Sequence, residues 1–87
     1  MANINILEIK AKAKSLEPVV RIGKNGMNDS VIQEIEKLLK KRKLIKIKML
    51  NNCPPEERDN IIERSVSETN SILIDKLGNV FVLYREK

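Results

Sequence analysis

The spacing of the apolar residues alternates between helical and strand-like periods along the chain, and this alternation is the strongest constraint on its fold. Over residues 5–16 the apolar side chains recur at steps of three and four, which predicts an amphipathic helix. The β-branched run at 19–22 predicts a short buried strand. Asn28 and Asp29 then suit the start of a second helix, which is predicted to end in the cationic run 40–43.

The second half continues the alternation with one strand, one helix and a hairpin. Apolar and charged residues alternate over 44–50, as in a strand with one buried face. A third helix is predicted over residues 55–69, and Asn70 can end it in the left-handed conformation. The segments 72–77 and 80–84 flank a two-residue Gly-Asn turn, which predicts a terminal β-hairpin.

These elements predict an α/β fold in one compact domain that spans residues 1–87. The order is helix, strand, helix, strand, helix, strand, strand, so two strand–helix–strand passages share a sheet with the hairpin. A four-stranded mixed sheet layered with three helices satisfies that order. A chain of 87 residues that is 41% hydrophobic can bury roughly 60% of its unfolded surface, which is enough for one core.

Positive charge is concentrated in the first half of the chain. Residues 1–50 hold twelve basic and five acidic side chains, whereas residues 51–87 hold five basic and seven acidic ones, for a net charge of +5. This asymmetry favours a polyanionic partner, of which nucleic acid is the commonest, and we expect the excess to lie around one binding loop. A surface that only keeps the protein soluble is the alternative.

Residue types needed for catalysis are missing, since the chain has no His and a single cysteine, Cys53. It lacks the usual general base near neutral pH, and one thiol cannot build a tetrahedral zinc site. We therefore predict no enzymatic activity, no metal and no cofactor. The lone thiol fits a reducing compartment, and Lys10, Lys12 and Lys14 interrupt the apolar stretch near the start. We expect a cytoplasmic monomer without a membrane partner.

A glycine-bounded loop separates the first predicted strand from the second helix. It reads Gly23-Lys24-Asn25-Gly26. Paired glycines let the backbone turn sharply and approach a ligand, while Lys24 and Asn25 supply a cation and a donor. The N–H groups that begin the next helix suit a phosphate oxygen. The loop lacks the residues of a Walker or dinucleotide motif, so we predict a phosphodiester contact, with a purely structural turn as the alternative.

Three further cations are candidates to act with the loop. Arg21 interrupts an apolar strand directly before it, and Lys46 and Lys48 share the polar side of the following strand. We predict that they contact the same polyanion. The alternative is that charged residues simply occupy a solvent-facing surface.

The scarcity of aromatic residues distinguishes between modes of nucleic-acid binding. Phe81 and Tyr84 are the one Phe and the one Tyr, and their spacing places them on opposite sides of a strand. A sheet that stacks bases needs two or three exposed aromatic rings. Recognition is therefore predicted to rest on phosphates, shape and the 2′-hydroxyl, which favours structured RNA over a stacked single strand.

Three segments, in this order and spacing, resemble one family. The segments 16–26 (LEPVVRIGKNG), 44–48 (LIKIK) and 82–85 (VLYR), with Gly78 before the last, resemble the CRM domain in its stand-alone YhbY-like form. The name abbreviates chloroplast RNA splicing and ribosome maturation. The resemblance implies a fold related to the C-terminal domain of translation initiation factor three, with a loop comparable to the GxxG loop of KH domains.

The resemblance also implies a function. It implies an RNA-binding protein that associates with precursors of the large ribosomal subunit. It maps the family's loop onto residues 23–26 and its basic sheet positions onto Lys46 and Lys48, and it matches Arg85 at the end of the pattern. The predicted RNA-binding residues are Arg21, Gly23, Lys24, Asn25, Gly26, Lys46, Lys48 and Arg85.

The sequence as a whole predicts a non-catalytic protein that binds structured RNA, ribosomal or precursor, during large-subunit assembly. Two alternatives stay open. One is a DNA-coating architectural protein, because small basic archaeal chromatin proteins have a related α/β fold. The other is a protein-interaction adaptor on ribonucleoprotein particles, in which the acidic second half meets a partner.

Overall fold

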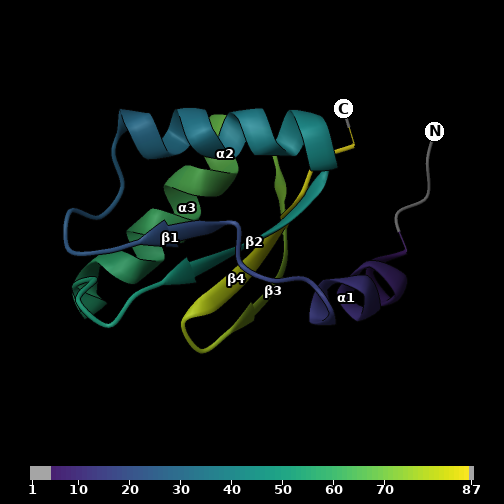
Figure 1. Cartoon of the computed structure of the whole chain (residues 1–87), viewed down its shortest axis with the longest axis horizontal. Helices are drawn as coiled ribbons and strands as arrows, with labels where there is room; N and C mark the ends of the chain where they lie inside the picture. The colour runs from purple at the N-terminus through teal and green to yellow at the C-terminus, as the bar shows by residue number, and fades with distance from the viewer. Residues whose placement is uncertain (1–4, 87) are drawn as a thin grey trace.

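The computed structural model describes residues 5–86 and contains the predicted elements in the predicted order (Figure 1). They are α1 (Ile6–Lys14), β1 (Val20–Ile22), α2 (Asp29–Arg42), β2 (Leu44–Met49), the 3₁₀ turn η1 (Pro55–Glu57), α3 (Arg58–Thr69), β3 (Ile72–Leu77) and β4 (Val80–Tyr84). The predicted α/β class is confirmed. Within residues 5–86, every helix falls short of the length and apolar character that crossing a membrane requires.

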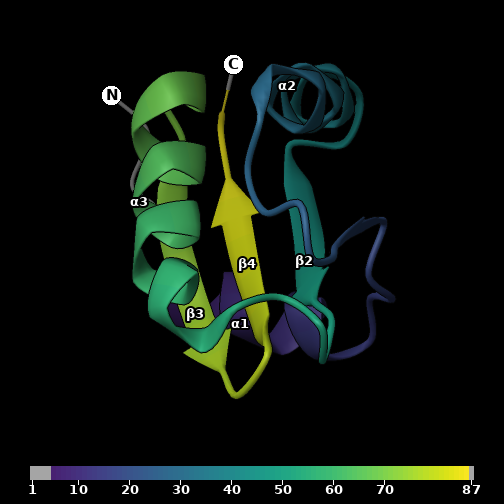
Figure 2. The same ribbon diagram turned by 90° about the vertical axis from the view of Figure 1, so that its left-hand side faces the viewer.

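The four strands form one mixed sheet in the order β1-β2-β4-β3. β1 pairs with β2 in parallel, while β4 pairs with both β2 and β3 in antiparallel fashion. Helices α2 and α3 lie on one face of the sheet, and α1 lies on the other (Figures 1 and 2). The edge strands differ, because β1 is three residues long whereas β3 carries an irregularity in its register between Leu73 and Asp75.

The main core lies between the sheet and the pair α2 and α3. The alternation in β2 buries Ile45, Ile47 and Met49 beneath these helices, as predicted. On β4, Phe81 lies opposite Ile47 and is also fully buried. The helices contribute Ile35, Leu39, Ile61 and Ile62.

A smaller apolar cluster lies under α1. It consists of Ala13, Ile74 and Val82, with Ile9, Leu44 and Tyr84 packed against it. The predicted apolar stripe of α1 is therefore buried only in part, because Ile6 stays 44% exposed at the start of the helix. The helix covers part of the outer sheet face and leaves the outer side of β1 free.

The helix ends follow the predicted signals. The Asn28 side chain caps α2 by accepting a hydrogen bond from the N–H of Val31, at 3.0 Å. Asn70 ends α3 with φ 53° and ψ 43°, the predicted left-handed conformation. The predicted third helix is divided, since Pro55 starts a 3₁₀ turn and regular α-helix begins at Arg58. Lys43 caps the end of α2 at φ 66°, in a region that favours glycine.

Candidate nucleic-acid interface

The structure explains why the loop 23–26 has a glycine at both of its ends. Gly26 has φ +64°, a value that is strained for a residue with a side chain, and its N–H donates to the Gly23 carbonyl at 3.0 Å. A Cβ placed on Gly23 would lie 3.3 Å from the Asn52 side-chain oxygen, so the neighbouring loop approaches closely. This tight turn leaves Lys24 and Asn25 exposed at its tip.

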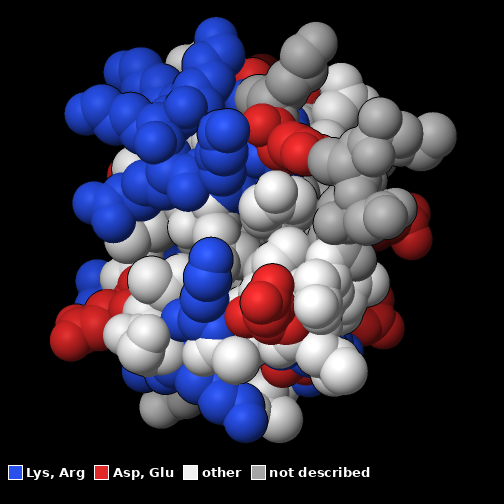
Figure 3. Space-filling view, turned by 90° about the vertical axis from the view of Figure 1, so that its right-hand side faces the viewer, with Lys and Arg blue, Asp and Glu red and all other residues white. Residues whose placement is uncertain are grey.

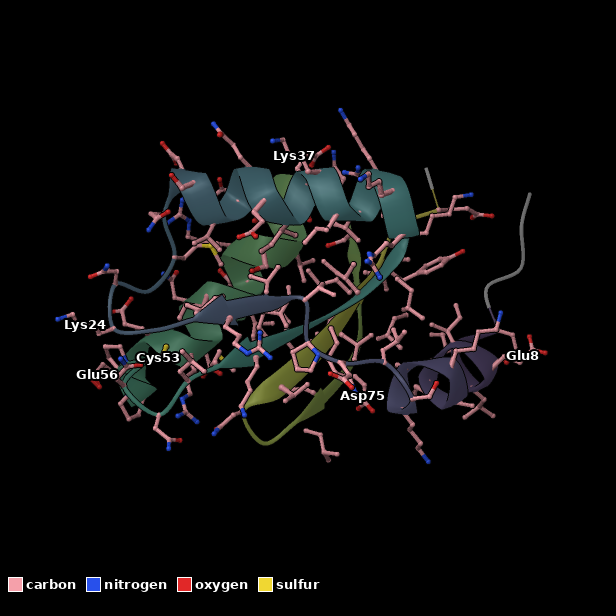
Figure 4. The ribbon with its side chains drawn as sticks, viewed as in Figure 1. Glu8, Lys24, Lys37, Cys53, Glu56 and Asp75 are labelled. Atoms are coloured by element: carbon pink, nitrogen blue, oxygen red, sulfur yellow. The ribbon has the colours of Figure 1, made fainter. Side chains whose placement is uncertain are left out.

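Lys24 projects from one end of the molecule, the end that also carries Glu56 and Cys53 (Figure 4). A hollow lies behind the tip, and it is lined by Lys24, Asn25, Gly26, Met27, Pro54, Glu57, Asn60 and Arg64. Arg64, from α3, is a cation that the sequence did not predict at this position. Its Nε donates to Glu68 Oε2 at 2.7 Å, and this hydrogen bond raises the pKa of Arg64.

The start of α2 offers less to a phosphate than the sequence predicted. The N–H of Val31 is already bound by the Asn28 side chain. Asp29 adds an exposed carboxylate in the first turn, which repels an anion. An anion at this end of the molecule therefore depends on the side-chain cations more than on backbone donors.

Two of the predicted cations form a pair beside the loop. Arg21 lies opposite Lys48 in the parallel register of β1 and β2. Val20 and Ile22 point into the core on either side of Arg21, so its side chain lies on the outer face of the sheet, where Lys48 is also exposed. Arg21 stands two residues before Gly23, so the pair brings two positive charges to the strands that lead into the loop.

Lys46 occupies a different environment from Lys48. It is half-buried and lines a hollow of about 200 Å³ between α1 and the sheet. Lys10, Lys14 and Asp75 line the same hollow. Lys46 therefore joins a group of lysines under α1, with one carboxylate among them, and is separated from the loop tip.

Arg85 lies apart from the other predicted residues and is bound within the fold. Its Nη1 donates to both carboxylate oxygens of Glu36 at 2.9 Å and to the Thr69 carbonyl at 2.7 Å. The Arg85 side chain is only 12% exposed. These contacts join the end of β4 to α2 and α3, so the geometry favours a structural role, and an RNA contact by Arg85 stays a prediction.

Replacing Arg85 by methionine is expected to lower the free energy of unfolding by about 2 kcal/mol, because Glu36 and the Thr69 carbonyl lose their donor. The loss stays below that of a fully buried pair, since the Glu36 side chain is 35% exposed. Urea denaturation followed by circular dichroism measures it. The exposed Arg21, changed to methionine as a control, should alter stability by less than about 0.5 kcal/mol. Unchanged stability in Arg85→Met would contradict the structural role.

The densest group of cations lies away from the loop. Lys and Arg side chains gather over the C-terminal end of α2, which Figure 3 shows as a continuous blue area. They belong to the run Lys40, Lys41, Arg42 and Lys43. The expectation that the excess positive charge surrounds the loop is therefore incomplete. Much of this charge lies at the C-terminal end of α2, whereas the loop lies at the N-terminal end of that helix.

Comparison with known proteins identifies the family. Residues 1–85 match the CRS1 / YhbY (CRM) domain. The chain is 38% identical to the "Probable RNA-binding protein YqeI" of Bacillus subtilis, over 90% of this chain and 80% of that protein. It is also 38% identical to an "RNA-binding protein" of Haemophilus influenzae, over 88% and 77% of the two chains.

A solved structure shares the fold. The solution structure of the hypothetical protein SAV1595 from Staphylococcus aureus aligns with a TM-score of 0.77 at 30% identity. The alignment covers 94% of this chain and 84% of that chain. The match over residues 1–85 and the identity to these relatives show that the chain belongs to the CRS1 / YhbY (CRM) domain family.

Proposed function

We propose that this protein binds structured RNA through the loop 23–26 together with Arg21 and Lys48, a group called the loop site below. The observation that carries the proposal is a set of three exposed cations: Arg21 and Lys48, which lie opposite each other on β1 and β2, and Lys24, on the loop that directly follows β1. The names of the relatives in Bacillus and Haemophilus, which describe RNA-binding proteins, support the choice of RNA.

The loop site is suited to the RNA backbone rather than to bases. Phe81 is fully buried and no aromatic residue lines the hollow behind the loop. Lysine and arginine side chains neutralise phosphates without reading sequence, while Asn25 can hydrogen-bond to a phosphate or a 2′-hydroxyl. The loop site therefore positions the protein on folded RNA by shape and charge.

The finer proposal is that the RNA is ribosomal or precursor RNA, bound in the cytoplasm during large-subunit assembly, and that the protein binds without catalysing a reaction. The resemblance of the loop and strand segments to the YhbY-like form supports this choice. Co-sedimentation of the protein with large-subunit precursors in a sucrose gradient tests it. Binding to particles without binding to naked RNA would favour the adaptor alternative.

The salt dependence of RNA binding tests the loop site directly. If Arg21, Lys24 and Lys48 each neutralise a phosphate, the loop site should contribute about −2 to −3 to the slope of log affinity against log salt. Filter binding with a folded ribosomal RNA fragment measures the slope. An affinity independent of salt would contradict the proposal. A duplex DNA that outcompetes the RNA at equal salt would favour the DNA-coating alternative.

A further inference from the structure

A second basic groove lies at the other end of α2 from the loop site. It has a volume of about 630 Å³ and separates α1 from the C-terminal end of α2. It is lined by Ile9, Lys12, Ser15, Leu16, Arg42, Lys43, Leu44 and Tyr84. Three of these lining residues are cations. Among residues 5–86, no acidic residue lines the groove. We call it the α1–α2 groove.

The cations of the groove come from two separate elements. Lys12 lies on the last turn of α1, and Arg42 and Lys43 end α2. All three side chains are exposed. They face one depression from both sides, so an anion in the groove meets positive charge on each wall.

Lys43 has a backbone conformation that glycine would adopt at a lower cost in free energy. Its φ is 66° and its ψ is −32°. The backbone there is held by two hydrogen bonds, from the Lys43 N–H to Leu39 and from the Arg85 N–H to the Lys43 carbonyl. The Lys43 backbone is therefore fixed at the end of α2, and its charge adds to those of Lys12 and Arg42.

Tyr84 is the aromatic residue of this groove. It is the sole tyrosine of the chain, which has no tryptophan. One part of its side chain packs against the small cluster of Ala13, Ile74 and Val82, and it stays half-buried at the groove wall. Leu44 lies opposite Tyr84 on the neighbouring strand and also lines the groove. The groove therefore combines an aromatic and apolar floor with cationic walls.

We propose that the α1–α2 groove is a second RNA subsite that takes one unpaired nucleotide. The base stacks on the Tyr84 ring, and the phosphates on either side of that nucleotide contact Lys12, Arg42 and Lys43. This inference rests on the proposed function, because it takes RNA as the ligand. It adds a contact with a base to the backbone contacts of the loop site.

The length of α2 sets the distance between the two subsites. A helix of 14 residues spans about 20 Å. The RNA that engages both subsites therefore has a paired stem of about that length, with an unpaired nucleotide at the end that meets the groove. A fully paired stem engages the loop site alone.

The Tyr84 ring gives a direct readout of stacking. In an NMR titration, the protein is mixed with each of two RNA hairpins that share the same stem, about 20 Å long. One hairpin has an unpaired adenine beside the stem, and the other does not. A stacked base is expected to shift the Tyr84 ring proton signals upfield with the first hairpin and not with the second. Phe81, which is fully buried, is the internal control and should not shift with either hairpin.

Charge-matched variants test the cationic walls. Lys12→Ala with Lys43→Gly removes two charges from the groove and relieves the strained backbone, so the melting temperature should not fall. Lys37→Ala with Lys40→Ala removes two charges from exposed positions of α2 outside the groove. The groove variant should lose at least about tenfold in affinity for the hairpin with the unpaired adenine, and the control about threefold at most.

Tyr84→Leu separates stacking from packing. Leucine keeps an apolar contact with the small cluster but cannot stack a base. The variant should lose at least about fivefold in affinity for the hairpin with the unpaired adenine, and little for the other. Equal affinities for the two hairpins, with an unshifted Tyr84 ring, would overturn the groove and leave the loop site in place. Failure of both hairpins to bind would contradict the proposed function itself.

Discussion

Replacing Phe81 by alanine is expected to lower the free energy of unfolding by about 3 to 5 kcal/mol. Phe81 is 0% exposed and lies opposite Ile47 at the centre of the main core. Its removal leaves a cavity that α2 and α3 cannot close without shifting. Because small domains are stable by only about 5 to 15 kcal/mol, the variant should be largely unfolded at moderate urea concentrations. Equilibrium urea denaturation measures the change.

A matched control lies in the same hairpin. Leu77 is 78% exposed, so Leu77→Ala should change stability by less than about 0.5 kcal/mol. A loss of less than about 1 kcal/mol in Phe81→Ala would mean that the ring is not part of the core.

Replacing Arg21, Lys24 and Lys48 together by alanine is expected to weaken RNA binding on the order of a hundredfold. Each side chain that loses a charge-assisted contact to phosphate costs about 1 kcal/mol or more. The slope of log affinity against log salt should become shallower by about 2 to 3, since three phosphate contacts are removed. All three side chains are exposed, so stability should change little. Filter binding over a series of salt concentrations measures both quantities.

The control for this triple variant removes the same charge from another surface. Lys37, Lys40 and Lys41 are exposed on α2. Their joint replacement by alanine should weaken binding only a few-fold, through the lower net charge. Equal losses in the two triple variants would show that the net charge, rather than the loop site, determines RNA binding.

Much of the fold follows from local patterns in the sequence. The hairpin forms over the predicted segments because Gly78, at φ 61°, meets the demand of the turn. The left-handed Asn70 ends α3 as predicted. Local patterns do not resolve the 3₁₀ turn before α3, since Pro55 and the two glutamates after it suit the start of either kind of helix. They also overstate the buried face of α1, because burial depends on how far the sheet extends beneath the helix.

The site was predictable only where neighbouring residues form it. The loop 23–26 carries its signal in consecutive residues, and the family resemblance covers the same segment. Arg64 reaches the loop from α3, and its spacing from Glu68 in the sequence indicates only an ion pair within a helix. Tyr84 and Lys12 come together by tertiary packing across 72 positions, which no local pattern encodes. Arg85 was predicted from the family pattern, whereas its contacts form only in the folded chain.

The two edges of the sheet limit how this protein can associate with copies of itself. β1 offers only three residues to a new strand. On β3 the register is interrupted between Leu73 and Asp75, and the Asp75 carboxylate accepts the N–H of Lys76 at 2.9 Å. Short, irregular and charged edges are poor templates for further strands. The exposed Ile72 and Leu77 therefore lie on an edge strand that is a poor template for the growth of a fibril.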